Sequence, residues 1–416
     1  MIFQYIFIIL CCTFIIILAI IKIKYPFWNL QPVYHTYDYI RSMYKTPFIV
    51  NINKPYFTKY LDQNHIKTVS VDDNNKTSIN KLTDLLQCHY LMNETIDFII
   101  KPEDIYAIHT GQLESSFISL YRIPEYQLNP NENKDGVEIC ESYKILGGLT
   151  SRTLNMYIKF NKEDSVFKKE KIYFIDFLST HREHDYKKII RNLIQTHEYN
   201  QRMINKNIYI SLIKKEGELF GGVIPLISYN TFLYNLSNKD ISPLDKNCTI
   251  ELLKPGSMQS YIDYFTINNG LEEKTRFFDF MAIPDIGNII TQIKQKLLYG
   301  ICLRNGKNIL GFYFIKDTKR YYDDSESLTL SLICSVQNCN NSRLFYVGFL
   351  HALREIVHIN PDYKLLNIEN IGHNQTIASF WNIEHKYVNN VSTAYYSYNY
   401  IYPRSPIASN RCFVLV

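Results

Sequence analysis

The feature that most constrains this chain of 416 residues is its N-terminal apolar segment. Residues Ile2 to Ile21 are apolar apart from Gln4 and Thr13. A helix of this length, at about 1.5 Å per residue, covers the roughly 30 Å hydrocarbon core of a bilayer. A cleaved signal peptide would instead show a basic start, a shorter apolar run and a small-residue cleavage site. We therefore predict one transmembrane helix within residues 1–24.

The residues around this segment predict its orientation. Lys22 and Lys24 follow it, and no Lys or Arg precedes it. By the positive-inside rule, we expect a single-pass membrane protein whose body faces the cytosol. The nine cysteines are odd in number and lack paired CxxC spacing, which fits a reducing compartment. They predict neither a disulfide framework nor a structural zinc site.

Composition narrows the partners and the number of cores. The net charge of +5 is spread along the chain, so it gives no electrostatic argument for nucleic acid as a partner. A hydrophobic content of 46% can bury one large core or two ordinary ones, and we expect two packed halves. The richness in Ile, Asn, Lys and Tyr is typical of an AT-rich genome, such as that of a large DNA virus, and says nothing about mechanism.

Periodicity predicts an α/β body in two similar parts. Polar, turn-rich stretches at Asn129 to Gly136 and Ser237 to Asn247 predict a surface loop and a linker between the halves. Each half contains a strand, a helix and a second strand in that order, which indicates a duplicated unit. The predicted elements are a strand at 171–180, a helix from Tyr186, a strand at 207–213, a hairpin of strands 298–304 and 309–315 around Asn305-Gly306, a strand at 328–334, a helix from the N-cap Ser342 to Val357, and a strand at 365–368.

A motif directly after the apolar segment resembles a known family. Residues 25–33 read YPFWNLQPV. This stretch is similar to the N-terminal region of the N-myristoyltransferases (glycylpeptide N-tetradecanoyltransferases), which carries Phe-Trp-x-x-Gln-Pro-Val. An aromatic belt beside a membrane helix is the alternative interpretation, because Tyr and Trp favour the bilayer interface. The matching residues are Phe27, Trp28, Gln31, Pro32 and Val33.

Two further stretches carry the same resemblance. Residues 175–181, IDFLSTH, resemble the family's Ile-Asn-Phe-Leu-Cys-Val-His strand, which bulges so that the backbone amides of its Phe and Leu form an oxyanion hole. Taken alone, this stretch also fits an ordinary buried strand. The chain ends on the apolar sequence RCFVLV, which resembles the family's C-terminus. At low identity the resemblance runs in order from Tyr25 to Val416.

The resemblance implies an α/β (α+β) fold of two tandem GNAT-type acyltransferase units around a saddle-shaped mixed sheet, preceded by the transmembrane helix of residues 1–24. Residues 25–236 would bind acyl-CoA, and residues 237–416 would form the peptide groove. The implied reaction transfers a myristoyl group from myristoyl-CoA, a co-substrate and not a permanent cofactor, to the N-terminal glycine of a protein. The implied partners are acyl-CoA, glycine-initiated peptides and, through residues 2–21, a membrane.

The resemblance also assigns roles to residues. The amides of Phe177 and Leu178 would form the oxyanion hole, and the α-carboxylate of Val416 would take a proton from the glycine ammonium. Free N–H groups at a helix start would attract the pyrophosphate. No metal is implied, since His181 and His184 lack a third ligand at suitable spacing. The implied coenzyme A contacts are Pro26, Phe27, Trp28, Ser179, Thr180, Tyr186, Lys187, Lys188, Ile189 and Ile190, and the implied substrate contacts are Tyr90, Phe98, Asp176 and Tyr209.

Several residues depart from the family pattern. Asp176 replaces an Asn beside the glycine site, Ile210 replaces a Thr, and Asp185 replaces an Arg near the pyrophosphate, although Asp185 also fits a helix N-cap. Residues 91–95 and 230–233, near the peptide, differ as well. Two alternatives therefore stay open. One is a degenerate relative that binds acyl-CoA or a glycine terminus at a membrane without turnover, and the other is a GNAT-type transferase that acts on a lipid or a small amine.

Overall fold

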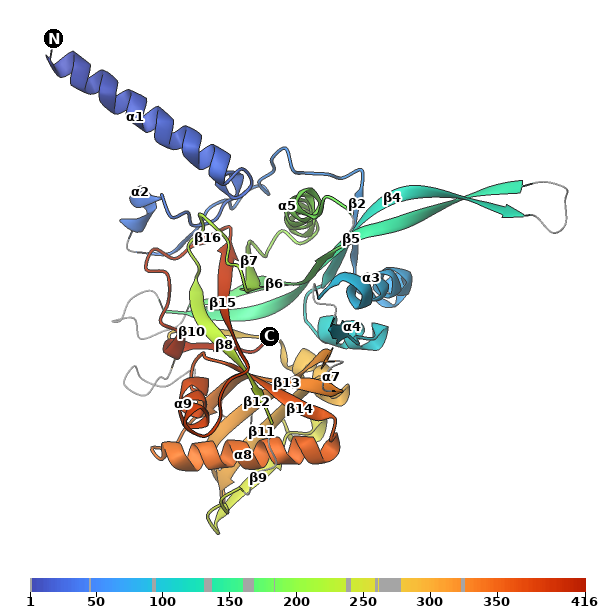
Figure 1. The fold of residues 1–416 in the computed structure, drawn as a ribbon, viewed down its shortest axis with the longest axis vertical. Coiled ribbons are helices and arrows are strands. Elements are labelled where there is room, and N and C mark those ends of the chain that lie inside the picture. Colours follow the sequence, from blue (N-terminus) through green and yellow to red (C-terminus); the bar gives the residue numbers. More distant parts are fainter. Residues whose placement is uncertain are drawn as a thin grey trace.

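The computed structural model has a mixed α/β architecture (Figure 1). It describes residues 2–44, 46–91, 95–130, 137–159, 168–182, 184–236, 241–258, 261, 278–322 and 326–416. Within these residues, 15 strands form one mixed sheet that runs through both halves of the body. The predicted fold class is therefore confirmed.

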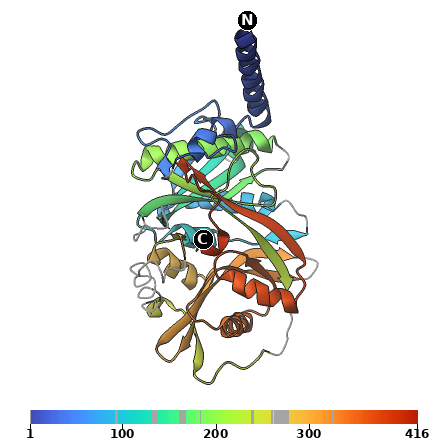
Figure 2. The same ribbon diagram turned by 90° about the vertical axis from the view of Figure 1, so that its left-hand side faces the viewer.

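The N-terminal helix α1 (Ile2–Lys24) stands clear of the body in two perpendicular views (Figures 1 and 2). It is apolar all round, so it has no polar face that would suit water. In the described part of the chain it is the one helix that is long and apolar enough to cross a membrane. The predicted helix is present, and its membrane role stays a prediction.

The first half is an antiparallel meander followed by a strand-helix-strand unit. β2, β4, β5 and β6 pair antiparallel in that order, and β6 pairs in parallel with β7 across the helix α5. The predicted strand, helix and strand are confirmed, although the second strand begins at Ile210 and not at Asn207. The bounds are β2 (Ile66–Ser70), α3 (Lys76–His89), β3 (Ile96–Phe98), α4 (Pro102–His109), β4 (Phe117–Pro130), β5 (Val137–Ile158), β6 (Lys168–Thr180), α5 (Tyr186–Ile204) and β7 (Ile210–Glu216).

The second half repeats this order. β11, β12 and β13 are antiparallel, and β13 pairs in parallel with β14 across α8. The predicted hairpin is confirmed with a two-residue loop, in which Gly306 adopts a φ of +56°. The predicted cap Ser342 is wrong: it lies inside the first turn, and the Asn341 side chain accepts from the Leu344 N–H at 3.0 Å. The bounds are β9 (Cys248–Leu252), α7 (Ile286–Lys294), β11 (Leu298–Asn305), β12 (Asn308–Tyr322), β13 (Ser327–Gln337), α8 (Ser342–Ile359), β14 (Tyr363–Glu369) and α9 (Asn374–Glu384).

Two strands exchange between the halves and join them into one sheet. β8 (Ile227–Asn235) continues the first half but pairs with β14, and β15 (Asn389–Tyr398) returns from the second half to pair with β7 and β8. Figure 1 shows both strands running from one half to the other. Residues 241–247 of the predicted linker have no regular structure, and residues 237–240 lie outside the described ones.

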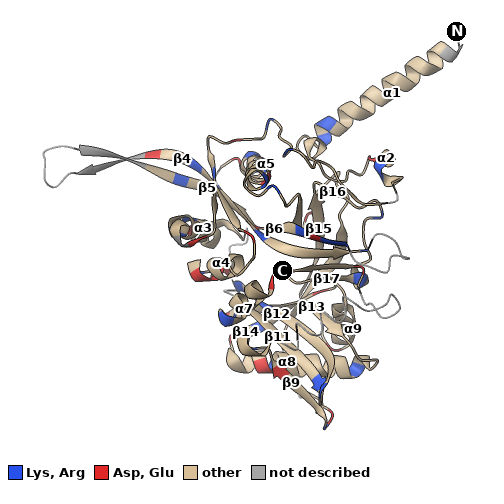
Figure 3. Ribbon diagram, turned by 180° about the vertical axis from the view of Figure 1, so that it is seen from behind, with Lys and Arg blue, Asp and Glu red and all other residues tan. Residues whose placement is uncertain are grey.

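The remaining elements cover the edges. β4 and β5 leave the body as a two-stranded ribbon (Figures 1 and 3), so Asn129 belongs to a strand and not to the predicted loop; residues 131–136 lie outside the described ones. β17 pairs in parallel with β10, which pairs with β5. The other bounds are α2 (Tyr39–Ser42), β1 (Phe48–Ile49), β10 (Phe280–Ile283), β16 (Tyr400–Ile401) and β17 (Cys412–Val414).

Candidate functional site

The strand β6 bulges at the predicted place. Gly148 of β5 pairs with Ser179, and Thr150 pairs with Asp176, so Phe177 and Leu178 share a single partner position on β5. A bulge of this kind locally turns a strand out of its ladder and is common beside active sites. Phe177 also has a φ of +51°, which a bulky residue rarely adopts. The sheet around β6 therefore holds Phe177 in a strained conformation.

The Phe177 ring is surrounded by aromatic side chains from three elements. Its centroid lies 5.9 Å from Tyr90, 6.2 Å from Phe98 and 5.9 Å from the ring of His109. Tyr90 and Phe98 are themselves 4.7 Å apart. The structure thus brings together three of the predicted site residues, Tyr90, Phe98 and Phe177, and adds His109, which the sequence did not indicate.

The carboxylate of Asp176 occupies one of the predicted oxyanion donors. The Phe177 N–H donates to Asp176 Oδ1 at 2.9 Å. The Asp176 backbone oxygen in turn accepts from the Thr150 hydroxyl at 3.2 Å. The Phe177 amide can therefore serve a thioester oxygen only after the Asp176 side chain has turned away.

The C-terminus of the chain is buried between the two halves. Leu415 donates its N–H to the Ala282 oxygen at 2.9 Å, and Val416 is 7% exposed. Figures 1, 2 and 3 all place the chain end in the middle of the molecule. Lys316 Nζ of β12 donates to the Val416 oxygen at 3.4 Å. Burial lowers the pKa of Lys316 to about 8, while the charge of Asp176 opposes this shift.

Two buried basic side chains, those of Arg152 and His109, belong to the same cluster of titratable groups. Arg152 Nη1 donates to Asn288 Oδ1 at 3.2 Å, whereas its Nε and Nη2 are buried without a hydrogen-bond partner among the described residues. His109 Nδ1 lies 2.9 Å from the Ile105 oxygen, which assigns the proton to Nδ1. Burial lowers the pKa of His109 to about 4, so the ring is neutral at pH 7. We call these residues the central cluster: His109, Arg152, Asp176, Lys316 and Val416.

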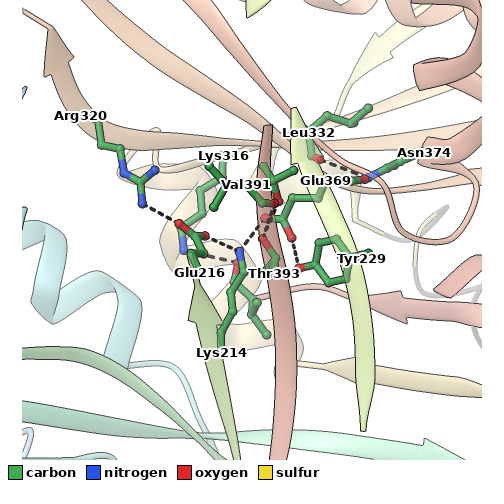
Figure 4. A network of polar contacts seen from close by, with 12 residues as sticks. Lys214, Glu216, Tyr229, Lys316, Arg320, Leu332, Glu369, Asn374, Val391 and Thr393 are labelled. Carbon is green, nitrogen blue, oxygen red and sulfur yellow. Dashed lines mark hydrogen bonds and ion pairs between the residues drawn. The ribbon is translucent and has the colours of Figure 1, made fainter. Parts of the chain in front are cut away.

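A polar network connects the two halves beside the central cluster (Figure 4). Lys214 Nζ lies 3.0 Å from Glu216 Oε1 and 2.9 Å from Glu369 Oε1. Arg320 Nη2 donates to Glu216 Oε2 at 3.0 Å, and the Tyr229 hydroxyl donates to Glu369 Oε2 at 2.5 Å. Lys214, followed by Arg320, holds the pKa of Glu216 well below its usual value, against its burial. Ion pairs and a hydrogen bond to a carboxylate thus connect four strands, β7, β8, β12 and β14.

The segment predicted to contact coenzyme A packs on the body. The buried Phe27 ring lies 4.9 Å from Trp28 and 5.1 Å from Tyr60, and Trp28 lies 4.5 Å from Phe220. Pro26 is exposed. These contacts place Phe27 in the body core and leave the aromatic-belt interpretation without support for that residue.

The residues predicted to receive the pyrophosphate lie at the start of α5. Asp185 caps the helix, as predicted, by accepting from the Lys188 N–H at 3.3 Å. Tyr186, Lys187 and Lys188 are exposed, whereas Ile189 is buried and Ile190 partly so. At the end of β6, Ser179 and Thr180 are buried, and Ser179 Oγ has no hydrogen-bond partner within the described residues. The rings of His181 and His184 lie 5.2 Å apart, and the described residues contain no set of three side chains that could hold a metal.

Tyr209 lies apart from the central cluster. The parallel register pairs Ile172 with Ile210 and Ile175 with Ile213. Tyr209 therefore precedes the first residue pair of β6 and β7, and Asp176 follows the last one. The two residues are thus five positions apart along the strands, which at about 3.3 Å per residue separates them by roughly 17 Å. The same register carries Lys214 alongside Asp176. Tyr209 is therefore not beside Asp176 in this register, and its role as a substrate contact stays a prediction.

Comparison with known proteins gives a match in structure and none in sequence. No protein-family model matches the sequence, and no curated protein matches it. The structure is similar to a crystal structure of Saccharomyces cerevisiae N-myristoyltransferase with bound myristoyl-CoA, with a TM-score of 0.64 at 12% identity over 92% of this chain and 94% of that chain. A second structure of the yeast enzyme, with bound myristoyl-CoA and inhibitors, gives a TM-score of 0.65 at 12% identity over 94% of each chain. At this identity the likeness is one of architecture, and it shows that the chain has the fold of the N-myristoyltransferases.

Proposed function

We propose that this protein transfers a long-chain fatty acyl group, myristoyl or one of similar length, from acyl-CoA to the N-terminal glycine amine of a protein. The observation that carries the proposal is the buried chain end, with Val416 7% exposed between the halves. A buried terminal carboxylate is costly unless it is paired or used. The yeast enzyme of the same fold was crystallised with bound myristoyl-CoA, which supports acyl-CoA as the donor.

The proposed reaction is a direct transfer. The α-carboxylate of Val416 takes one proton from the glycine ammonium, and the freed nitrogen attacks the thioester carbonyl carbon. The C–N bond forms and the C–S bond breaks. The coenzyme A thiolate leaves and takes up the second amine proton, so the products are an amide and coenzyme A. The amides of Phe177 and Leu178 would donate to the oxyanion that develops on the carbonyl oxygen.

In this scheme, binding of the glycine ammonium by Asp176 also releases the Phe177 amide. Its carboxylate accepts the Phe177 N–H at 2.9 Å. An ammonium is a stronger partner for a carboxylate than a neutral amide is. The glycine ammonium would therefore draw Asp176 away, and the Phe177 amide would then be free for the thioester oxygen.

The proposed coenzyme A contacts lie in the first half. Pro26, Phe27 and Trp28 would line one side, and Ser179 and Thr180 would hold the thioester end. The pyrophosphate would meet the free N–H groups at the start of α5, helped by the residues Tyr186, Lys187, Lys188, Ile189 and Ile190.

The proposed domain division follows the chain order. Residues 1–24 would anchor the protein in a membrane, residues 25–236 would bind acyl-CoA, and residues 237–416 would form the peptide groove. Because Lys22 and Lys24 lie in the last turn of α1, the body would face the cytosol. Protease treatment of sealed microsomes checks this orientation, since a cytosolic body is digested from outside and a lumenal body is protected.

The experiment that tests the activity uses the full chain in detergent or nanodiscs. It is incubated with an alkyne analogue of myristoyl-CoA and a pool of Gly-initiated peptides, and matched Ala-initiated peptides are the control. Label on the Gly-initiated peptides alone is the expected result. Absence of label on any peptide, with acyl-CoA bound, would contradict the proposed transfer.

A second candidate function is a membrane-attached binder of acyl-CoA that does not turn over. The observation in its favour is that a carboxylate, Asp176, occupies the Phe177 amide, and another carboxylate, Asp185, caps the helix proposed to receive the pyrophosphate. Both carboxylates oppose anionic groups at their positions. Acyl-CoA bound with one-to-one stoichiometry, without labelled peptide, distinguishes this binder from the transferase.

A further inference from the structure

The surface beside the body end of α1 carries an exposed apolar patch. Tyr39 and Ile40 of α2 are each 74% exposed, and Met43 and Tyr44, which follow α2, are 79% and 52% exposed. We call these four residues the α2 patch. Single exposed apolar residues are ordinary, but four on one short segment mark a surface that another apolar phase covers.

The α2 patch is held in a fixed position relative to α1. Tyr25, the residue after α1, packs its ring against Gly222, where a Cβ would come within 2.8 Å of the ring. His35 then joins two segments: its Nε2 lies 2.8 Å from the Trp28 oxygen and its Nδ1 lies 3.1 Å from the carboxylate of Asp38, which precedes α2. Figure 1 accordingly shows α2 beside the body end of α1.

The chemistry around the α2 patch fits the interface of a phospholipid bilayer. The exposed Lys22 and Lys24 at the end of α1 bring positive charge to the level where phosphate groups lie, whereas Arg41 inside α2 is paired with Asp38 at 3.1 Å. Tyr39 and Tyr44 combine an apolar ring with a hydroxyl, a combination that favours the interface.

We propose that the α2 patch lies in the interface of the same bilayer that α1 crosses, so that the body rests on the membrane and does not swing freely from α1. This inference rests on the proposed membrane span of α1. It has a consequence for the donor, because Phe27 and Trp28 follow Lys24 within four residues. Acyl-CoA, an amphiphile, would then reach its proposed site from the membrane surface, and the lipidated product would leave to the same surface.

The test places a photo-crosslinker at three positions of the full chain in vesicles of phosphatidylcholine and phosphatidylserine. The side chain of Met43, Ile16 or Ile383 is replaced in turn by p-benzoylphenylalanine. Met43 reports on the patch, and Ile16, in the middle of α1, reports on the membrane span. Ile383 of α9 is the matched control, since it is 82% exposed against 79% for Met43 but belongs to the second half.

Mass spectrometry then identifies what each position contacts. The expected result is lipid adducts at Ile16 and Met43, with about tenfold less at Ile383. Adducts at Ile16 but not at Met43, or a crosslink from Met43 to a second copy of the chain or to another protein, would overturn the patch proposal and leave the span intact. No lipid adduct at Ile16 would remove the span itself, and the patch proposal with it.

Discussion

The strand-helix-strand units of the two halves, β6–α5–β7 and β13–α8–β14, are built alike. In each unit the two strands are parallel and the helix is the crossover. Each first strand also has a bulge at an equivalent place: Phe177 and Leu178 share one partner position, and Ile333 is the extra residue between two consecutive pairs of β12 and β13. Positions 177 and 333 each precede the start of their helix, at 186 and 342, by nine residues.

The two units differ in what surrounds the bulge. Ile333 is 3% exposed and packs with Phe413 and Leu415 in an apolar cluster, without a positive φ. Phe177, in contrast, is strained at a φ of +51° and lies beside Asp176 and His109. Packing therefore fills one bulge with hydrocarbon and leaves the other beside titratable groups.

The helices of the two units show the same difference. The buried side of α8 is mostly apolar and includes Phe345 and Phe349, whereas the buried side of α5 includes His197, Glu198 and Gln201. Buried polar groups cost stability, so a fold retains them where they do something other than stabilise. The comparison shows that titratable and polar groups are buried in the first unit, whereas the equivalent places in the second unit are filled by apolar side chains.

The largest expected effect concerns the polar side of α5. Burial raises the pKa of Glu198 to about 7 from its ordinary value of 4.5. Between these pH values the folded protein keeps a proton that the unfolded chain has lost, so stability falls as pH rises through this window. Glu198→Gln removes this pH-dependent loss of stability. The variant should have a free energy of unfolding higher by about 3 kcal/mol above pH 7, and no higher below pH about 4. Thermal unfolding from pH 4 to 8 measures this, and parallel curves for both proteins would contradict it.

The next effect concerns the chain end. Adding one Gly after Val416 displaces the proposed base, and a misplacement of about 1 Å can already cost about a hundredfold in rate. We expect a loss in kcat of at least about a hundredfold with unchanged acyl-CoA affinity, because the proposed donor contacts lie in the first half. Steady-state kinetics measure kcat, and a binding titration measures the acyl-CoA affinity. Full activity of the extended chain would point to a side chain of the central cluster as the base.

A smaller effect is expected at Asp176. If its carboxylate binds the glycine ammonium, Asp176→Asn should raise the peptide KM about tenfold, since a charge-assisted hydrogen bond contributes about 1.5 kcal/mol or more. The matched control is Asp279→Asn in the second half, which breaks a half-exposed ion pair with Arg411 at 2.9 Å. Peptide kinetics should respond to the first substitution and not to the second. An equal KM for both variants would assign Asp176 to blocking the Phe177 amide alone.

The smallest effect uses the two tryptophans of the chain, one in each half. Trp28 lies in the proposed donor segment, and Trp381 is buried under α8. Trp28→Ala should weaken acyl-CoA binding by about fivefold, because an aromatic contact contributes about 1 kcal/mol. Trp381→Phe should lower the unfolding temperature and leave acyl-CoA affinity unchanged. Isothermal titration of both variants measures the difference, and equal affinities would remove Trp28 from the donor site.

Local sequence was sufficient for the elements that periodicity encodes. The strand-helix-strand order of both halves, the hairpin at Gly306 and the cap at Asp185 were predicted, because each depends on residues within a few positions of one another. The strands β4 and β5 were not predicted, and the end of β4, Asn129 and Pro130, belongs to a stretch that reads as a polar loop. The cap of α8 was misplaced by one residue, between two side chains, Asn341 and Ser342, that can both cap.

The residues of the candidate site also differ in whether the local sequence indicates them. Motif resemblance pointed to Phe177, Asp176 and Val416, each on a stretch that reads as a unit. His109, Arg152 and Lys316 gave no signal, and the place of Lys214 alongside Asp176 follows only from the strand register.

By itself the sequence determined an apolar N-terminal helix, two α/β units and an apolar chain end. The tertiary structure alone decided which groups meet: Lys316 reaches Val416 across 100 positions of sequence, and the Lys214–Glu369 pair spans 155. It also decided which of two equivalent bulges is filled, since that depends on where β17 enters the sheet. The physical reason is that periodicity encodes which face of an element is buried, whereas the partners of a buried charge are set by strand order and register over the whole sheet.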